Sequence, residues 1–424
     1  MLPSLRASMG EHASLRSSIR KSKDMHVIGG TYLESVQDRG VDRLFGSGFR
    51  AAACLSHLDD IKFHSYIGGD CAAIFAATAK SFGLVKNEIE AVAQARSFAY
   101  ATSLARPSVN AYGHDPNVRV ICVRSEEPIL RFGMLEQEAV VHGKKVVYDP
   151  QNPYDPLVYW GNGSTAEELV IVANHKEVRS LFGDDVAGGI RRQFGQHPEL
   201  VCVVRKYGPL GADVFTPDGS VEHIPAYRTH EVFSVGTGDV FSAYFSYFWS
   251  VAGKPFAVAA DLASRAVAKY VSGVGSIQKE TEETLTHLPY KPVNSSRPKI
   301  APIYLAGPFF TLEETMFLQE IKHAFSSMDV PVFSPIDDVG VGDAAKVYRG
   351  DIKGLVRSDS VFANVCGMDA GTIYEIGYAK ALGKSVTVFA QDCKQKDMTM
   401  FVGGGCNCFS DFTSAVYNAV WDTM

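Results

Sequence analysis

Long apolar segments are missing from this chain. Nowhere in its 424 residues does an uninterrupted hydrophobic run approach the roughly 18 residues that a membrane-spanning helix needs. A basic surplus is missing as well, because 41 Lys and Arg residues stand against 47 Asp and Glu residues, a net charge of −6. Nucleic-acid binding requires a positive surface that neutralises phosphates. The sequence therefore predicts small-molecule partners, and neither a nucleic acid nor a membrane.

Paired cysteines are also lacking. The eight cysteines are scattered, and none of them forms a C-x-x-C pair or a zinc-ligand spacing. Cys406 and Cys408 lie close together but lack the further ligands that zinc requires. We expect reduced thiols, a cytoplasmic location and no metal bound directly by side chains.

The chain does contain enough apolar sequence, 46% of its residues, for two globular domains. We predict an α/β fold, with a three-layer α/β/α domain at 25–287 and a smaller doubly wound, flavodoxin-like parallel-sheet domain at 299–424. Residues 288–298 hold three prolines and are interpreted as an extended linker. Residues 1–24 are interpreted as a disordered extension, with a transit peptide as the alternative.

Short apolar runs predict the strands of the first domain, and helical patterns lie between most of them. The runs are Val27 to Thr31, Lys62 to Ile67, Arg119 to Val123, Lys145 to Tyr148, Leu169 to Val172 and Leu200 to Val204. This alternation predicts a mainly parallel sheet covered by helices.

The most informative stretch of the second domain runs from Asp351 to Phe389 and carries several carboxylates around one strand-to-helix turn. The apolar run at 360–365 predicts a strand, and the pattern after it predicts an amphipathic helix that leads to a second strand. In such βαβ units ligands bind beyond the carboxyl ends of the strands, where Asp369 and Glu375 fall. We expect Glu375 in the first helical turn, where the helix dipole favours an ionised carboxylate, a candidate nucleophile.

Several ordered motifs make residues 299–424 resemble the nucleoside 2-deoxyribosyltransferase family. The matching motifs are Tyr304 to Phe310, Ser334-Pro335, Asp351 to Asp359 and Asp369 to Tyr378. The resemblance implies that Glu375 attacks the anomeric carbon of a nucleoside and that Tyr304 orients it, with no cofactor. It also implies substrate contacts from Gly307, Asp351 and Asp369. The alternative is that these acids are helix caps and solvated turn residues.

A glycine-rich loop at 234–239 leads into an aromatic helix that we expect at Val240 to Trp249. Glycines at a helix N-terminus let backbone N–H groups approach phosphate oxygens, and an acid at the end of the loop can take a proton from an attacking hydroxyl. The predicted phosphate-binding residues are Gly236, Thr237 and Gly238, and the predicted general base is Asp239. The alternative is an ordinary turn at the start of a helix.

The order of the motifs around this loop makes residues 25–285 resemble the ribokinase-like carbohydrate and nucleoside kinases, often called the PfkB family. The matching motifs are Gly29 to Glu34, Tyr66 to Asp70, Asp149 to Gln151, Asn174 to Glu177 and Arg205 to Gly208. The resemblance implies ATP and Mg²⁺ as cofactors, with the ion near Asn174 and Glu177. It also implies nucleotide contacts from Lys206 and Gly208, in addition to Asn174 and Glu177, and substrate contacts from Glu34, Gly48 and Arg50.

Four residues depart from the pattern of that family. Phe233-Ser234 replaces the usual Asp-Thr before the glycine loop, Arg50 stands where the sugar-binding asparagine falls, and Glu34 replaces an aspartate. Arg50 is predicted either to contact an anionic acceptor or to lie exposed on the first turn of a helix. The segment that supplies the lid in the family is expected to be short, between Glu34 and Gly46.

We therefore predict a bifunctional enzyme of nucleoside metabolism. The C-terminal domain would cleave or transfer the N-glycosidic bond of a (deoxy)nucleoside through Glu375, and the N-terminal domain would phosphorylate a sugar or nucleoside hydroxyl with ATP. In one alternative the kinase acts first and the C-terminal domain hydrolyses a nucleoside 5′-monophosphate. In another the chain is a non-catalytic nucleotide sensor. We expect a homo-oligomer, dimer or higher, because the resembled family completes its sugar site from a neighbouring subunit.

Overall fold

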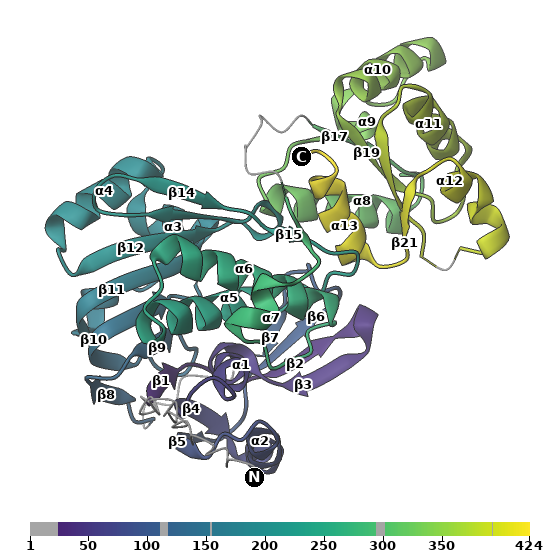
Figure 1. Cartoon of the computed structure of the whole chain (residues 1–424). Helices are drawn as coiled ribbons and strands as arrows, with labels where there is room; N and C mark the ends of the chain where they lie inside the picture. Colours follow the sequence, from purple (N-terminus) through teal and green to yellow (C-terminus); the bar gives the residue numbers. More distant parts are fainter. Residues whose placement is uncertain (1–23, 111–117, 153–154, 294–301, 392) are drawn as a thin grey trace, which may run out of the picture.

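The computed structural model describes residues 24–110, 118–152, 155–293, 302–391 and 393–424 (Figure 1). Nearly all of the predicted N-terminal extension and the second half of the predicted linker lie outside the described residues. The first half of the linker contains β16 (Lys291–Pro292), which pairs with β15 (Tyr227–Arg228). The domain boundaries therefore stay predictions.

A large, mainly parallel sheet forms the core of the N-terminal half, as predicted. Its strand order is β14-β13-β12-β11-β10-β9-β1-β4-β5, with β8 paired to β10. All its pairs are parallel except β12–β13 and β13–β14. The strands are β1 (Met25–Ile28), β4 (Ile61–Gly68), β5 (Lys86–Val92), β8 (Cys122–Ser125), β9 (Ile129–Phe132), β10 (Val140–Asp149), β11 (Thr165–Asn174), β12 (Leu200–Lys206), β13 (Ala212–Phe215) and β14 (Val221–Ile224). The strand expected at Arg119 to Val123 thus begins three residues later.

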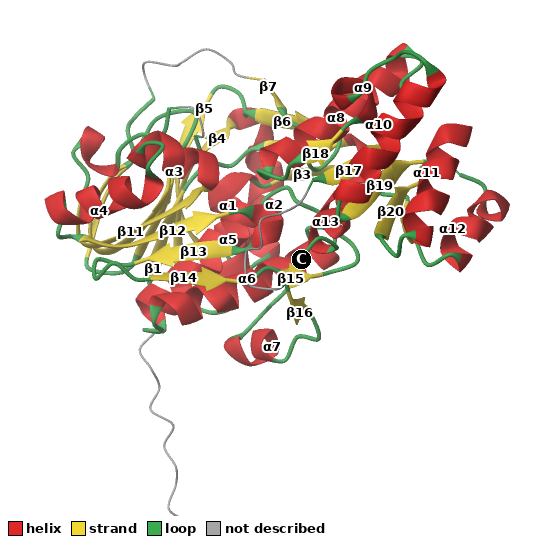
Figure 2. Ribbon diagram, turned by 90° about the horizontal axis from the view of Figure 1, so that it is seen from above, coloured by secondary structure: helices red, strands yellow, loops and turns green. Residues whose placement is uncertain are grey.

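Helices cover both faces of this sheet, which makes three layers (Figure 2). Along β10, Val147 points to one face, while Val146 and Tyr148 point to the other, because side chains alternate along a strand. The first face is covered by α1 (Gly46–Leu55), α2 (Ala72–Ser81), α5 (Thr237–Ser246) and α6 (Phe256–Ser272), and the second by α3 (His175–Phe182) and α4 (Val186–Gln196). The aromatic helix expected from Val240 begins at Thr237 and continues as a π-helix, η5 (Tyr247–Val251). A short helix, α7 (Glu282–Thr286), follows.

A separate four-stranded sheet stands where a short lid segment was expected. Its order is β3-β2-β6-β7, formed by β2 (Leu33–Val36), β3 (Val41–Leu44), β6 (Ser97–Tyr100) and β7 (Ser108–Asn110). The segment between Glu34 and Gly46 is short, as expected, and supplies β2 and β3. The sequence did not predict β6 and β7, which lie more than fifty residues after Glu34 and are short, partly exposed strands. Such strands carry little hydrophobic periodicity, and tertiary pairing rather than local pattern creates them.

The C-terminal half is built on a five-stranded, all-parallel sheet of order β18-β17-β19-β20-β21. The first strand in sequence is second in space, which is the flavodoxin-like order that was predicted. The strands are β17 (Ile303–Ala306), β18 (Val332–Phe333), β19 (Ser360–Asn364), β20 (Ser385–Phe389) and β21 (Asn407–Phe409). The helices are α8 (Leu312–Ser327), α9 (Pro335–Asp338), α10 (Ala344–Arg357), α11 (Ala370–Ala381), α12 (Thr399–Gly403) and α13 (Phe412–Trp421).

Helix α13 joins the two halves of the molecule (Figure 1). One side packs on the smaller sheet through Phe412, Val416 and Val420. From the other side, the indole Nε1 of Trp421 donates a hydrogen bond of 2.9 Å to the Pro209 carbonyl of the N-terminal half. In the part of the chain that the structure describes, no helix has the length and apolar character that crossing a membrane would require.

Candidate functional site

Two groups of predicted site residues lie in different parts of the molecule. The first group gathers at the carboxyl ends of β17 and β19, where a parallel sheet presents its ligand crevice. Gly307 follows β17, Asp369 precedes α11, and Glu375 lies within α11. A Cβ placed on Gly307 would be 3.3 Å from the Cβ of Asn364 at the end of β19, so glycine allows this close approach of the two strand ends.

Glu375 is the central residue of this group. The Tyr304 hydroxyl, which extends from β17, donates a hydrogen bond of 2.5 Å to Glu375 Oε1. Burial raises the pKa of Glu375 to about 7, and the neighbouring carboxylates of Asp351 and Asp369 act in the same direction, although the Tyr304 hydrogen bond opposes them. The carboxyl group is therefore held close to the point of ionisation at neutral pH.

One expectation about Glu375 was wrong. Because α11 begins at Ala370, Glu375 is its sixth residue and lies in the second turn rather than the first. The stabilisation of an anion by the helix dipole fades beyond the first turn. Burial and the nearby acids therefore raise the pKa of Glu375. The sequence had suggested the opposite, a carboxylate that the helix dipole stabilises in its ionised form.

The other two acids of the group behave differently from each other. Asp369 is the N-cap of α11, and its Oδ2 accepts hydrogen bonds of 2.7 and 2.9 Å from the backbone and hydroxyl of Thr372. The helix-cap alternative therefore describes Asp369 well. Asp351 projects from α10, and its Oδ1 is buried without a hydrogen-bond partner among the described residues. A buried acceptor without a partner is costly, so Asp351 has the character of a ligand-binding group.

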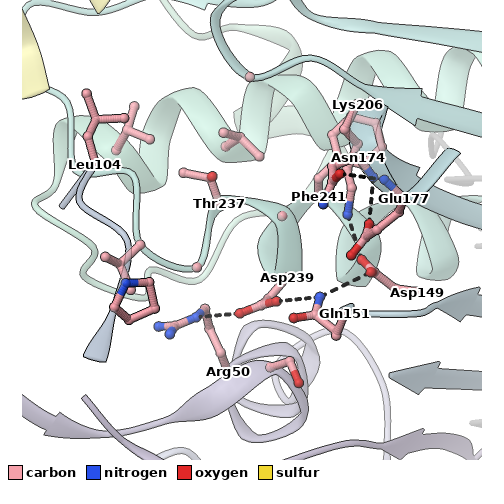
Figure 3. A pocket seen from close by; sticks show the side chains of 18 of the residues that line it. Arg50, Leu104, Asp149, Gln151, Asn174, Glu177, Lys206, Thr237, Asp239 and Phe241 are labelled. Carbon is pink, nitrogen blue, oxygen red and sulfur yellow. Dashed lines mark hydrogen bonds and ion pairs between the residues drawn. The ribbon is translucent and has the colours of Figure 1, made fainter. Parts of the chain in front are cut away.

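The second group comes from the N-terminal half and lines a cavity of about 1020 Å³ (Figure 3). The glycine loop forms one side of it, since Gly236 has a φ of 84° and caps α5. Thr237 and Gly238 open the helix, and Asp239 follows in its first turn, so the predicted loop-and-acid arrangement is present. A Cβ on Gly238 would lie 3.3 Å from the Lys206 ammonium, which places this cation beside the loop.

Arg50 is buried at the bottom of this cavity and binds the protein's own acids. Its Nε donates a 3.1 Å hydrogen bond to Asp239 Oδ2, its Nη2 forms an ion pair with Glu34, and its Nη1 contacts the Tyr270 hydroxyl at 3.0 Å. The side chain is 0% exposed, so the alternative of an exposed arginine was wrong. A Cβ on Gly236 would lie 2.0 Å from Arg50 Nε, which shows that the guanidinium reaches the glycine loop.

Asp239 is consequently hydrogen-bonded on both carboxylate oxygens. Gln151, in a left-handed conformation with φ of 56°, donates to Asp239 Oδ1 at 3.2 Å and to Asp149 Oδ1 at 3.1 Å. Asp149 in turn accepts a 2.6 Å hydrogen bond from Lys206. Burial raises the pKa of Asp239 to about 6, although the ion pair with Arg50 opposes that shift.

Asn174 and Glu177 form a capping box at the start of α3. Asn174 Oδ1 accepts from the Lys176 and Glu177 amides, and Glu177 Oε2 accepts from the Asn174 amide at 2.8 Å. Burial, and next the charge of Asp149, raise the pKa of Glu177 to about 7. Within the described residues no three His, Cys, Asp or Glu side chains are grouped so that they could hold a metal ion.

Some residues of the cavity were missed, and one predicted residue lies outside it. Gly48 does not line the cavity; a Cβ there would lie 2.4 Å from the Gly29 backbone, so its role is close packing of α1. Gln151 belongs to the Asp-Pro turn that the sequence suggested but was not identified as a site residue. Tyr417 and Trp421 of α13 also line the cavity, and no local sequence signal points to them.

Comparisons with known proteins found one family match and several similar structures. Residues 303–411 match the model of the nucleoside 2-deoxyribosyltransferase family. An uncharacterized protein of Ureaplasma parvum is 33% identical over 99 residues, which cover 20% of this chain and 62% of that protein. The family match contains Tyr304, Asp351, Asp369 and Glu375 and so includes the first group in full.

Several solved kinase structures are similar to 62% of the chain. One is a ribokinase from Giardia lamblia, with 13% sequence identity, a TM-score of 0.47 and 98% of that chain covered. Another is a ribokinase from Arabidopsis thaliana in complex with ribose and ATP, with 15% sequence identity, a TM-score of 0.46 and 98% of that chain covered. An aminoimidazole riboside kinase from Salmonella enterica is similar over 62% of this chain and 99% of its own (16%, TM-score 0.44). The chain thus combines a segment that matches the deoxyribosyltransferase family with a region similar to ribokinase structures.

Proposed function

We propose that the C-terminal half cleaves the N-glycosidic bond of a nucleoside, with Glu375 as the nucleophile. The observation that carries this proposal is the partly buried Glu375 carboxyl, bound at 2.5 Å by Tyr304 at the ligand edge of the sheet. The match to the deoxyribosyltransferase family supports the same chemistry. A carboxylate of raised pKa that a neutral hydroxyl orients is suited to nucleophilic attack.

In the proposed reaction, one Glu375 oxygen forms a bond to the anomeric carbon while the bond from that carbon to the base nitrogen breaks. The electron pair of that bond leaves with the base, which takes up a proton. Water then hydrolyses the glycosyl ester, or a second base displaces Glu375, so the configuration is retained. Asp351, with a buried oxygen that lacks a partner, would accept a hydrogen bond from the nucleoside.

The test is a panel of ribo- and deoxyribonucleosides, with free base and the glycosylated protein measured by mass spectrometry. We expect base release by the wild type and none by Glu375→Ala. Release at the wild-type rate in that variant would exclude Glu375 as the nucleophile. Addition of a second base separates transfer, which yields a new nucleoside, from hydrolysis.

The free nucleoside is the proposed substrate, in preference to its 5′-monophosphate. Six residues before Glu375, the chain has Asp369, whose carboxylate is close enough to Glu375 to raise its pKa. A phosphate about 4 Å from that carboxylate would be repelled by about 4 kcal/mol per unit charge at an effective dielectric of about 20. Arg349, Lys353 or Arg357 of α10 could offset this repulsion, so kcat/KM must be compared for both substrates, in the wild type and in Asp369→Ser. A preference of the wild type for the monophosphate would contradict the proposal and favour a kinase-first order.

For the N-terminal half, we propose nucleotide binding and phosphorylation of a sugar or nucleoside hydroxyl by ATP. Asp239 would be the general base, the amides of Gly236 to Gly238 would hold the transferred phosphoryl group, and Lys206 would contact the phosphates. The residues fit a Mg²⁺ ion that enters with the nucleotide, because Glu177 uses only one carboxylate oxygen in the capping box. Such an ion would neutralise phosphate charge beside Asn174 and Glu177.

The Arg50 network favours a second candidate function, nucleotide binding without phosphoryl transfer. A general base must reach the acceptor hydroxyl, yet both Asp239 oxygens are occupied and Arg50 covers the glycine loop. ATP-dependent phosphorylation of the nucleoside and sugar panel distinguishes the two functions. Activity that falls by about 100-fold or more in Asp239→Asn supports transfer. Nucleotide binding with no phosphorylated product supports the sensor.

A further inference from the structure

The cavity beside the glycine loop is built by both halves of the chain. Its lining includes Ser327 and Met328 at the end of α8, and Tyr417 and Trp421 of α13, all from the C-terminal half. The contact continues at His175 of α3, whose Nε2 lies 3.8 Å from the Asp329 carboxylate. A molecule that reaches these four residues from the glycine loop would therefore touch both halves at once.

Two parts of the cavity lining differ in chemistry. At Lys206 and the loop amides, a cation and the N-terminus of α5 meet and favour anionic groups, although an anion must compete with Asp149 for Lys206. Another part of the lining consists of apolar and aromatic side chains, including Val267, Val271 and Trp421. The Tyr417 hydroxyl makes no hydrogen bond within the described chain and lies 3.5 Å from where a Cβ on Gly208 would be. A nucleotide, with a phosphate chain and a flat base, matches both parts.

Helix α8 connects this cavity with the Glu375 site. It begins at Leu312, five residues after Gly307, and ends at Ser327 in the cavity wall. Its 16 residues span about 24 Å at 1.5 Å per residue. A shift of its C-terminal end would move the loop that follows β17, because a helix transmits displacement as a rigid element.

Helix α13 makes a second connection, through the sheet. Its residues Phe412, Val416 and Val420 pack in one cluster with Leu305 of β17. The next residue back along that strand, Tyr304, points to the other face and holds Glu375. A change in how α13 packs on the sheet would thus displace β17, and with it the Tyr304–Glu375 pair on the other face of that strand.

We propose that the cavity is a regulatory nucleotide site shared by the two halves, and that its occupancy changes the rate of base release at Glu375. The phosphates lie at Lys206 and the loop amides, and the base lies against Tyr417 and Trp421. The inference rests on the proposed function only for the choice of ligand and for the activity that is regulated. It holds whether or not the nucleotide also transfers its phosphate.

The first test measures binding of ADP and GDP, with and without Mg²⁺, to the full-length chain by calorimetry, and base release in their presence. We expect at least one of them to bind and to change kcat/KM for base release by about fivefold or more, the usual lower range of allosteric coupling. Tyr417→Phe should weaken binding by about 2- to 10-fold through loss of one hydrogen bond. Tyr290→Phe is the matched control, because it also removes one hydroxyl, which bonds Ser272 outside the cavity.

The second test does not depend on activity. Hydrogen–deuterium exchange, with and without the bound nucleotide, should show protection in α13 and altered exchange at 303–312, next to Glu375. Failure of every nucleotide to bind would overturn the proposal, as would binding that changes exchange in the N-terminal half alone. If no base release is found under any condition, the assignment of Glu375 fails, while the exchange data still decide whether the site is shared.

Discussion

Glu375, which is partly buried, and Asp239, which is buried, both have raised pKa values, but their partners differ. Glu375 accepts a hydrogen bond from the neutral Tyr304 hydroxyl and has two acids nearby. Asp239 forms an ion pair with the fully buried Arg50 and accepts a further hydrogen bond from Gln151. Glu375 is therefore free to titrate and react near neutral pH, whereas Asp239 must first be released from Arg50.

The ionisation of Glu375 predicts the pH dependence of base release. Only the ionised carboxylate can attack, so kcat/KM should rise as pH increases through about 7, the pKa of Glu375, and then level off. Tyr304→Phe removes the hydrogen bond that lowers this pKa, and its profile should move to higher pH. Initial rates between about pH 5 and 9 check both statements. Equal profiles in wild type and variant would contradict the role of Tyr304.

The raised pKa of Glu375 also means that its ionised form, which the reaction needs, lowers the stability of the folded protein. Its pKa of 4.5 in the unfolded chain rises to about 7 in the folded protein, so its contribution to stability is complete below 4.5 and is lost as pH rises through about 7. Glu375→Gln should therefore increase the free energy of unfolding at pH 8, by on the order of 1–3 kcal/mol. At pH 4 the variant and the wild type should be equally stable. Urea unfolding at both pH values measures the change in stability that Glu375→Gln causes. An equal change at pH 4 and pH 8 would contradict the raised pKa of Glu375.

At the scale of elements, Arg50 ties three of them together. It projects from α1, pairs with Glu34 of β2, and reaches Asp239 of α5 past Gly236. This arrangement explains why the loop needs glycine at 236, since a side chain there would collide with the guanidinium. It also links the four-stranded sheet β3-β2-β6-β7 to the proposed catalytic loop.

Removal of Arg50 should therefore be costly. Arg50→Met leaves the buried Asp239 carboxylate without its cation and leaves Glu34 with Arg43 alone, and the free energy of unfolding should fall by about 3–5 kcal/mol. Arg265→Met is the control, because that arginine forms a partly exposed pair with Asp261 of the same helix and should cost less than about 1 kcal/mol. Urea unfolding measures the loss of stability in both variants. An equal loss in Arg50→Met and Arg265→Met would mean that the Arg50 network contributes little to the free energy of unfolding. Adding Glu34→Gln and Asp239→Asn should restore part of the loss.

At the scale of the whole molecule, the surface near the Glu375 site carries unusual apolar exposure. Phe310, Leu312 and Met316 are 72%, 75% and 61% exposed at the start of α8, next to the loop after β17. Exposed apolar clusters of this kind are typical of contact surfaces. They support the expected homo-oligomer, in which a second copy would cover this edge.

Light scattering tests that expectation. The wild type should have at least twice the chain mass of 46.1 kDa. The double variant Leu312→Glu, Met316→Glu should be monomeric, because the two positions are four residues apart and share one helix face. An active wild-type monomer would contradict the idea that a neighbour completes the site.

The sequence by itself determined the α/β class, the parallel strands and the two site motifs, because these depend on local patterns. Apolar runs of strand length predicted β1, β4, β10, β11 and β12, and the glycine loop and the segment before α11 predicted Asp239 and Glu375. Helix starts and buried parallel strands are encoded within a few residues, so reading the chain in order was sufficient.

The tertiary structure alone decided the electrostatics and the shared cavity. The pKa of Glu375 depends on Asp351 and on burial, the burial of Arg50 depends on Glu34 and Tyr270, and the cavity wall depends on α13, almost 200 residues after the glycine loop. Each of these properties is a sum over neighbours that lie far apart in sequence. Distance and burial set the strength of a charge interaction, and neither exists until the chain has folded.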